Sequence, residues 1–306
     1  MDRFADMRMF VTVAEVGSIS AAADRLGVAK SAVSRRLADL ETRLGVELLH
    51  RTTRRLALTD SGRAFWERSQ RILADLEEAE QEVSQAHGAI GGKLKVALPL
   101  GFGMLHLAPL IAEFQALHPA IEFDLDFNDR QIDLMQEGFD LAIRIARLAD
   151  SSLIARRLAP VRHAVCASPA YLARHGTPTR AADLARHPGL VYSNLANPAL
   201  WPYTGPDGQP GNVQVPVRLR ANNGEYLCQA AIAGLGVLLH PTFFLRDALD
   251  RGDLVTLLAD HGWPVVDAYA VYPPTRHLSR RVRAFVDFLA ARLAGEPRWD
   301  RPGSSA

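Results

Sequence analysis

Four polar side chains at two matching spacings carry the clearest chemistry in this sequence. Lys30 and Ser34 are four residues apart, as are Ser31 and Arg35, so on a helix all four share one face. Ammonium, hydroxyl and guanidinium groups can donate hydrogen bonds to phosphate oxygens and to base edges in a DNA major groove. These residue types at this spacing therefore predict a DNA-contacting surface.

The helix that would present this surface is predicted from its apolar residues. They recur at spacings of four, three and four and form one stripe: Val33, Leu37, Leu40 and Leu44. Such a stripe faces a protein core, so the four polar side chains would point the other way. A shorter helix is expected before it, with Ser18 or Ser20 as its N-cap and Gly27 at its C-terminal turn. This order of elements predicts a helix-turn-helix over residues 18–45.

A basic hairpin is predicted directly after the helix pair. Two strand-like runs, Leu48–Leu49 and Leu56–Leu58, flank an arginine-rich tip that contains Arg51 and Arg54. Residues 28–58 hold seven Lys or Arg and three Asp or Glu, a local net charge of +4, whereas the whole chain carries +1. The basic character is confined to one patch, which favours a targeted contact with phosphate or the minor groove. A solvated face on an ordinary helix pair would explain the helix spacing but not the hairpin that follows.

Length and composition set the broad class. A chain of 306 residues suits a small domain joined to a larger one, and 48% apolar residues suffice for a globular core. We find neither an uninterrupted stretch of eighteen apolar residues nor an N-terminal export signal, so we expect a cytoplasmic protein without a membrane contact. Two cysteines are too few for a disulfide framework, and no pattern indicates a metal site or a cofactor.

A long helix is predicted from Thr59 to His87, with Thr59 as its cap. Its apolar residues recur at seven, four, three and four positions: Phe65, Ile72, Leu76, Ala79 and Val83. A single narrow stripe on an otherwise charged helix predicts a dimer seam, for which we select Phe65, Ile72, Leu76 and Val83. The alternative is a helix that packs on its own domain. Gly88, Gly91 and Gly92 would follow as a hinge.

Alternating apolar runs predict an α/β region after this hinge. Strands are expected at Leu94–Leu98, Ile121–Phe127, Phe139–Ile145, Val161–Ala167, Leu190–Ser193, Val213–Ala221, Gly236–His240 and Ala268–Tyr272. Helices are expected at Leu105–Leu117, Gln131–Glu137, Glu225–Ala233 and Ser279–Leu293. This alternation indicates a parallel-type sheet covered by helices, and its long middle excursion indicates two lobes joined by crossing strands. The Pro-, Gly- and Ser-rich tail, residues 295–306, is expected to be disordered.

The N-terminal sixty residues resemble the DNA-binding signature of LysR-type transcriptional regulators. The residues that match, without a gap, are Phe10, Val11, Val13, Ala14, Glu15, Gly17, Ser18, Ala21, Ala22, Leu26, Ser34, Arg35, Leu40, Glu41, Leu44, Gly45, Leu48, Arg51, Leu58, Thr59 and Gly62. The resemblance continues more weakly through nearly all of the chain. Many members have Ser-Gln-Pro at the start of the recognition helix, where this chain has Ala29-Lys30-Ser31, so the base preference carried by that triplet does not transfer.

The resemblance implies an α+β and α/β architecture in four parts. These are a winged helix-turn-helix over 1–60, a linker and dimerisation helix over 61–90, an effector-binding domain over 91–294, and the tail. The effector domain would be periplasmic-binding-protein-like, with lobe I at 92–164 and 268–294 and lobe II at 165–267. The implied partners are double-stranded promoter DNA, a small-molecule effector, RNA polymerase, and further copies of the chain in a homodimer or homotetramer.

Loops at strand ends are the expected effector contacts. Ligands of α/β sheets bind beyond the carboxyl ends of the strands, where backbone amides and helix N-termini are available. By position, the candidate residues are Leu100, Gly101, Phe102, Asn128, Asn222 and His240. Leu100 and Phe102 stand where small hydroxyl residues are common in the resembled family, which favours an apolar or aromatic ligand. The backbone amides of the same loop could hold an anionic group, such as that of an organic acid. Each loop is also explained by ordinary turn chemistry, and His240 by a packed core.

Three other classes are weighed against a regulator. An enzyme lacks support because no phosphate loop, nucleophile elbow or acid/base constellation is evident, so no catalytic residue is selected. A solute-binding protein would fit the α/β region but not the winged helix or the missing export signal. A redox-sensing regulator could use Cys166 and Cys228, although both lie in apolar runs typical of buried thiols.

Overall fold

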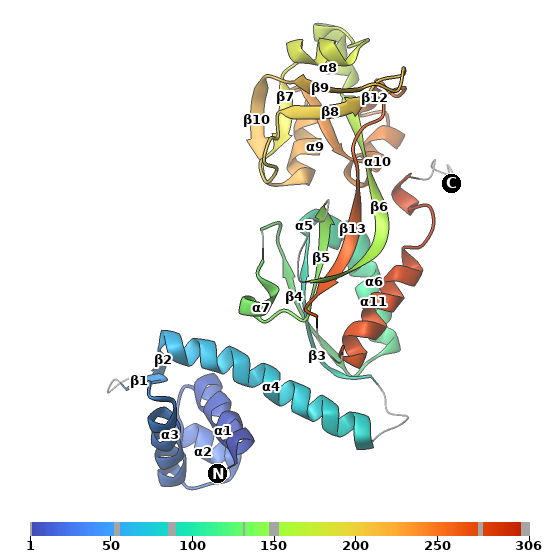
Figure 1. Cartoon of the computed structure of the whole chain (residues 1–306). Helices are drawn as coiled ribbons and strands as arrows, with labels where there is room; N and C mark the ends of the chain where they lie inside the picture. The colour runs from blue at the N-terminus through green and yellow to red at the C-terminus, as the bar shows by residue number, and fades with distance from the viewer. Residues whose placement is uncertain are drawn as a thin grey trace. The chain divides into compact units, whose positions relative to one another are not determined.

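The computed structural model of the chain describes residues 2–51, 56–84, 90–130, 132–146, 153–274 and 278–300. It divides into two compact units, one made of residues 1–89 with 135–138 and the other of residues 90–134 with 139–306. Figure 1 shows the elements of both units along the chain.

The first unit is a helix-turn-helix with a short hairpin and a long helix. Its elements are α1 (Arg3–Val16), α2 (Ile19–Leu26), α3 (Lys30–Leu44), β1 (Leu49–Arg51), β2 (Leu56–Leu58) and α4 (Asp60–Ser84). The Ser18 hydroxyl accepts a hydrogen bond from the Ala21 amide at 3.4 Å, and Gly27 ends α2 with a left-handed φ of 66°. Thr59 caps α4, because its hydroxyl oxygen accepts the Gly62 amide at 2.9 Å. The predicted helix-turn-helix and the predicted start of the long helix are confirmed.

The core of this unit is formed by α1, α2, α3 and the wing. Its buried members are Met9, Phe10, Val13, Ala22, Ala23, Val33, Leu37, Leu40, Leu48 and Leu49. Leu44, predicted as the fourth member of the α3 stripe, is 38% exposed. The apolar stripe therefore ends at Leu40, and Leu48 and Leu49 continue the core beyond it.

Gly62 brings α4 against the wing. A β-carbon at this position would lie 1.9 Å from the carbonyl oxygen of Leu48, which is far inside any allowed contact. Only glycine permits this close approach of helix and strand backbones.

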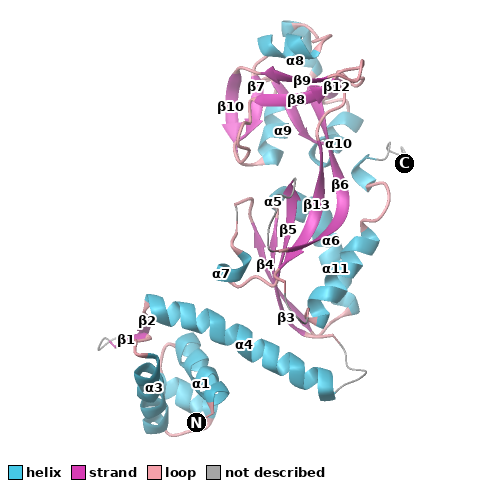
Figure 2. Cartoon of the chain, in the orientation of Figure 1, coloured by secondary structure: helices cyan, strands magenta, loops and turns pink. Residues whose placement is uncertain are grey.

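The second unit has a mixed sheet that extends through two lobes (Figure 2). Its strands are β3 (Gly92–Leu98), β4 (Ile121–Phe127), β5 (Leu141–Ala146), β6 (Ile154–Ala167), β7 (Gly189–Tyr192), β8 (Leu200–Thr204), β9 (Pro210–Gln214), β10 (Val217–Ala221), β11 (Val237–Pro241), β12 (Val255–Leu257) and β13 (Val265–Tyr272). The helical segments are α5 (Leu100–Phe102), the π-turn η1 (Gly103–Leu107), α6 (Ala108–Leu117), α7 (Leu134–Glu137), α8 (Pro169–His175), the 3₁₀ turn η2 (Ala181–Arg186), α9 (Gly224–Ile232), α10 (Thr242–Asp250), α11 (Arg280–Arg292) and the 3₁₀ turn η3 (Arg298–Asp300).

Strand β6 belongs to both lobes. The main path of the sheet is β10-β7-β11-β6-β13-β5-β3-β4, with β12 also paired to β6. Residues Ile154–Arg162 of β6 pair with β13, whereas His163–Cys166 pair with β11. Strands β3, β4 and β5 form the sheet of lobe I with β13, and β7, β10 and β11 form that of lobe II. Two long strands, β6 and β13, therefore connect the lobes (Figure 1).

The sheet differs from the predicted parallel type at these crossing strands. Pairs within each lobe are parallel, but β6 and β13 are antiparallel to each other and to their other neighbours. The β8–β9 hairpin, α8 and α10 were not predicted, and Pro216 divides the predicted run Val213–Ala221 into two strands. Proline has no amide hydrogen for a sheet ladder, which accounts for the break.

The helical run Leu100–Leu117 is the one stretch, among the described residues, that is long and apolar enough to span a membrane. Its Phe102, Leu107, Ile111 and Phe114 are buried in the lobe I core with β3 and α11 residues. Glu113 on its outer side pairs with Arg292 of α11. These contacts are those of a core helix of a globular domain.

The C-terminal tail is ordered as far as Asp300, against the prediction of disorder from residue 295. Trp299 is only 5% exposed and packs in the lobe I core. The Asp300 carboxylate pairs with Arg162 at 2.5 Å and accepts the Thr242 hydroxyl at 2.6 Å. The prediction of disorder rested on the Gly- and Pro-rich composition of the tail and did not consider the single large aromatic residue, Trp299. Residues 301–306 lie outside the described part of the chain.

Candidate DNA-binding surface and effector site

The predicted DNA-contacting side chains lie on the outer face of α3. Lys30, Ser31 and Arg35 are exposed, and Ser34 is half-buried. Val33, Leu37 and Leu40 face the core on the other side of the same helix. A buried stripe thus fixes the orientation of α3, and its first two turns present donors to solvent.

The wing is present as an antiparallel pair, in which Leu49 lies opposite Leu58 and Arg51 opposite Leu56. The Glu41 carboxylate of α3 accepts the Leu48 amide at 2.8 Å and the Leu49 amide at 3.2 Å, which joins the wing to the recognition helix. The side chain of Arg51 and the whole of Arg54 lie outside the described residues. Their contact with DNA stays a prediction.

Sequence reasoning missed the residue that anchors α3. Asp6 of α1 is 5% exposed, and its carboxylate pairs with Arg36 at 3.3 Å and with Arg43 at 3.2 Å. Two of the three arginines of α3 are therefore bound to the domain, which leaves Arg35 directed outward. No local spacing could reveal this, because Asp6 lies thirty or more positions from its partners.

The predicted dimer stripe on α4 is divided between two environments. Phe65 packs on Phe10 of its own domain with ring centroids 5.4 Å apart, so its assignment to a seam is wrong. The buried face of α4 instead contains Phe65, Ser69 and Leu73, whose spacing of four also suits a helix. Ile72 is 40% exposed, so its side chain remains available for the predicted dimer seam. The side chain of Val83 is outside the described residues.

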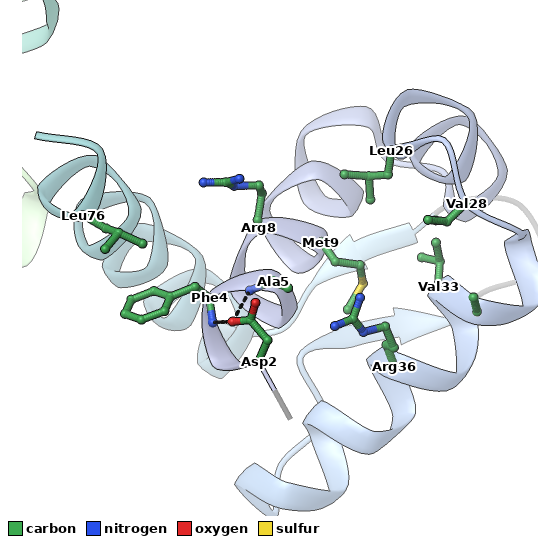
Figure 3. Close-up of a pocket in the computed structure, with 11 residues that line it drawn as sticks. Asp2, Phe4, Ala5, Arg8, Met9, Leu26, Val28, Val33, Arg36 and Leu76 are labelled. Carbon is green, nitrogen blue, oxygen red and sulfur yellow. Dashed lines mark hydrogen bonds between the residues drawn. The ribbon is translucent and has the colours of Figure 1, made fainter. Parts of the chain in front are cut away.

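Leu76 lines a groove of mixed polarity in the first unit, with a volume of about 570 Å³ (Figure 3). Its lining residues are Asp2, Phe4, Ala5, Arg8, Met9, Leu26, Val28, Ala32, Val33, Arg36 and Leu76. Phe4 and Val28 are 44% and 46% exposed. The groove contains apolar side chains of α1, α3 and α4 and none of the predicted effector residues.

The predicted effector loops meet where lobes I and II contact each other. The Leu100 amide donates to the Asp129 carboxylate at 3.0 Å, and the Asn194 side chain of lobe II donates to the Asp129 carbonyl at 3.2 Å. Burial, and then the negative charge of Asp129, raise the pKa of the Tyr192 hydroxyl in lobe II. Asp129, Tyr192 and Asn194 thus form an interlobe contact that was not predicted.

Two predicted effector residues are directed elsewhere. Phe102 is 1% exposed and packs edge-on against Phe243 and Trp299, at centroid distances of 5.2 Å and 5.3 Å. It is a core residue, because the helix begins at Leu100 and turns the Phe102 side chain inward. The Asn128 side chain accepts the Arg130 amide at 3.1 Å, as in an ordinary turn. Asn222 is exposed.

Gly101 and His240 do come together, on either side of Phe244. A β-carbon at Gly101 would lie 2.2 Å from Cζ of Phe244, and the His240 ring stacks on Phe244 with centroids 4.7 Å apart. His240 is 3% exposed, and burial lowers the pKa of its imidazole to about 3. The side chain is therefore neutral at physiological pH.

Both cysteines are enclosed in the core of lobe II. Cys166 is fully buried and Cys228 is 5% exposed. Burial raises the pKa of the Cys166 thiol, and it raises that of Cys228 to about 11. Reactive cysteines need an accessible thiolate, so this setting opposes a redox-sensing role.

Comparison with known proteins agrees with a winged-helix regulator that carries a ligand-binding domain. Residues 4–63 match the model of the bacterial regulatory helix-turn-helix proteins of the lysR family, and residues 87–294 match that of the LysR substrate binding domain. The chain belongs to the LysR family of transcriptional regulators.

Individual relatives cover nearly the whole chain. The regulator CrgA of Neisseria meningitidis serogroup B is 37% identical over 94% of this chain and 96% of its own length. The uncharacterized regulator YhjC of Escherichia coli is 36% identical over 95% and 97%. Among solved structures, that of CrgA has a TM-score of 0.61 at 36% identity, covering 95% and 99% of the two chains. The full-length virulence activator AphB of Vibrio cholerae has a TM-score of 0.60 at 29% identity, covering 95% and 99%.

Proposed function

We propose that this chain binds promoter DNA as a homodimer or homotetramer, with α3 in the major groove and the wing on the flanking phosphates. It changes transcription, through its contacts with DNA and RNA polymerase, in response to a small organic or aromatic effector bound between the lobes. It acts in the cytoplasm and performs no catalysis. The observation that carries the proposal is the outward face of α3, where Lys30, Ser31 and Arg35 are exposed.

The outward face can be tested directly by fluorescence anisotropy on the region upstream of the gene. Replacing Arg35 or Lys30 with alanine should weaken specific binding by about 1–3 kcal/mol, because each loses donors to base edges. Arg251→Ala is the matched control, since it removes an exposed arginine of lobe II that pairs with Asp253. Equal binding by Arg35→Ala and the parent chain would contradict the assignment of α3.

The effector site is supported by two interlobe contacts, that of Gly101 with Phe244 and that of Asp129 with Asn194. A ligand that contacts both lobes favours one of their arrangements by its differential affinity, typically about 1–3 kcal/mol. Gly101→Trp should abolish the effector response and preserve operator binding, because the indole would meet Phe244 and leave α3 unchanged. Thermal-shift screening of aromatic and aliphatic acids on the full chain would identify the ligand. A full response by Gly101→Trp would place the effector elsewhere.

A further inference from the structure

Phe244 of α10 contacts the beginnings of two helices, one from each lobe. Gly101 is the second residue of the helical run Leu100–Leu117, and Gly224 is the first residue of α9. A β-carbon would lie 2.2 Å from Cζ of Phe244 at Gly101, and 2.5 Å from its Cε2 at Gly224. The ring edge therefore touches both backbones, and any side chain at either glycine would occupy the same space.

His240 places a polar group beside the ring of Phe244. Its ring stacks on Phe244 at an interplanar angle of 22°, and a β-carbon at Gly224 would lie 2.6 Å from its Nε2. This Nε2 is buried, and its one polar contact among the described residues, with the Gly224 backbone, lacks normal hydrogen-bond geometry. Buried polar atoms are almost always hydrogen-bonded, so an unpartnered one beside an aromatic ring indicates a place that a ligand would complete.

The neighbouring backbone favours an anion. The first amides of a helix have no partner within the helix, and its N-terminus carries partial positive charge. One such amide, that of Leu100, already binds a carboxylate, which is the chain's own Asp129 at 3.0 Å. In α9 the Tyr226 amide is likewise bound, by the Asn223 side chain at 2.8 Å, so a ligand carboxylate would depend on the amides of Gly101 and Gly224, the two glycines that contact Phe244.

We propose that Phe244 fills the interlobe effector site with its own ring, and that an aromatic carboxylate acts by taking the place of this ring. The ligand ring would stack on His240 between Gly101 and Gly224, and its carboxylate would face the helix N-termini. Phe244 is half-buried, so part of the residue is open to solvent, and its ring would turn out to admit the ligand. This inference rests on the proposed effector response and names the residue that competes with the effector.

The competition predicts a gain of affinity when the ring is removed. We would titrate 4-fluorobenzoate into the full chain and follow binding by ¹⁹F NMR. The Phe244→Ala variant should bind it roughly tenfold more tightly than the parent, because the binding-competent state no longer depends on displacement of Phe244. Cyclohexanecarboxylate, which has the charge without the flat ring, should gain less.

Phe288→Ala is the matched control. It removes another half-buried phenylalanine, which packs on Phe114 within lobe I, and it should bind the probe as the parent does. Phe244→Leu, which keeps apolar volume without a flat ring, should show a smaller gain and serves if the alanine variant is unstable. His240→Leu in the Phe244→Ala background should reduce the gain, since the stacking surface is lost.

Two outcomes would overturn the inference. One is that Phe244→Ala and Phe244→Leu bind 4-fluorobenzoate no better than the parent; the other is that Phe288→Ala gains as much as Phe244→Ala. Operator binding by the same variants separates this inference from the proposed function. Variants that bind promoter DNA but gain no affinity for the probe contradict only the inference about Phe244. A parent chain that does not bind DNA specifically contradicts the proposed function as a transcriptional regulator.

Discussion

The arginines of the recognition helix differ in role, and the role of each depends on the group that its side chain contacts. Arg36 and Arg43 neutralise the buried carboxylate of Asp6, whereas Arg35 points away from the core. Removing one member of a largely buried ion pair leaves the other charge without a partner. The free energy of unfolding then falls, even where the intact pair contributes little to stability. A basic helix therefore cannot be counted as uniformly DNA-binding.

This division predicts a stability effect for Asp6→Asn. The free energy of unfolding of the first unit should fall by about 1–3 kcal/mol, because two guanidinium groups lose their charged acceptor. Denaturant unfolding, followed by circular dichroism, measures it. Glu15→Gln, which alters an exposed pair with Arg25, should change the same transition by less than about 0.5 kcal/mol. Equal effects of the two substitutions would contradict an anchoring role for Asp6.

The buried His240 predicts acid sensitivity of the second unit. Its folded pKa of about 3 lies below the ordinary 6.5, because burial disfavours the imidazolium and a charge on His163 would oppose it. Below pH 6.5 the unfolded chain binds a proton that the folded chain does not. The free energy of unfolding therefore decreases as the pH is lowered, by up to about 2 kcal/mol between pH 6.5 and pH 5.

Thermal unfolding at several pH values tests this. His240→Leu should reduce the decline between pH 6.5 and 5, and the part that remains is expected from His163, whose pKa burial lowers to about 4. His50→Gln, which changes an exposed histidine of the wing, should leave the decline as in the parent. An unchanged pH dependence in His240→Leu would show that other groups cause it.

At the scale of elements, α4 has one face that packs on its own domain and another that we propose as the dimer contact. Ile72 is 40% exposed and adjacent Leu73 is 7% exposed, so the two side chains diverge on the helix. Ile72→Asp should dissociate the dimer without unfolding the chain, because it places a charge in the intermolecular contact. Leu73→Asp should instead destabilise the first unit by several kcal/mol, since it buries a charge within the domain. Sedimentation and circular dichroism distinguish the two, and an intact dimer of Ile72→Asp would exclude this face of α4.

The same helix shows what periodicity can and cannot predict. Spacings of three and four correctly identify α3 and α4, and alternating apolar runs identify α11 and most strands, because each element has a buried side. They do not specify which neighbour covers that side. Phe65 is seven residues from Ile72 and so fits the predicted stripe, yet the close approach at Gly62 places it over Phe10.

The effector site was predicted less well for a related reason. Strand ends and glycines select Gly101 and the His240 segment, which the structure brings together at Phe244, because loop chemistry is local. Phe102 was misassigned because the helix starts five residues before its predicted first residue, Leu105. Asp129, Asn194 and Phe244 could not be selected, since their roles depend on which residues of the other lobe face them.

At the scale of the whole chain, the last described residues hold parts of the second unit together. Trp299 contacts Phe102 and His106 of lobe I and Phe243 of α10, while Asp300 binds Arg162 on the crossing strand β6. Trp299→Ala should lower the free energy of unfolding by about 3–5 kcal/mol, as expected for loss of a large buried aromatic. Thermal unfolding measures it. Trp263→Ala, at a half-buried position, should cost less, and a larger loss there would contradict the importance of the tail.

The position of lobe II within the chain also sets an order of folding. Lobe II is a continuous segment between β6 and β13, whereas lobe I needs residues from both sides of it. Glu113 meets Arg292 across 179 residues, and Arg162 meets Asp300 across 138. During synthesis the winged helix and then lobe II can fold before the chain is finished. Strands β3, β4 and β5 cannot complete lobe I until β13 and α11 have been synthesised. Long-range pairing of this kind is slow and leaves apolar strands exposed. We therefore expect lobe I to be the last part to fold and the part most dependent on chaperones during synthesis.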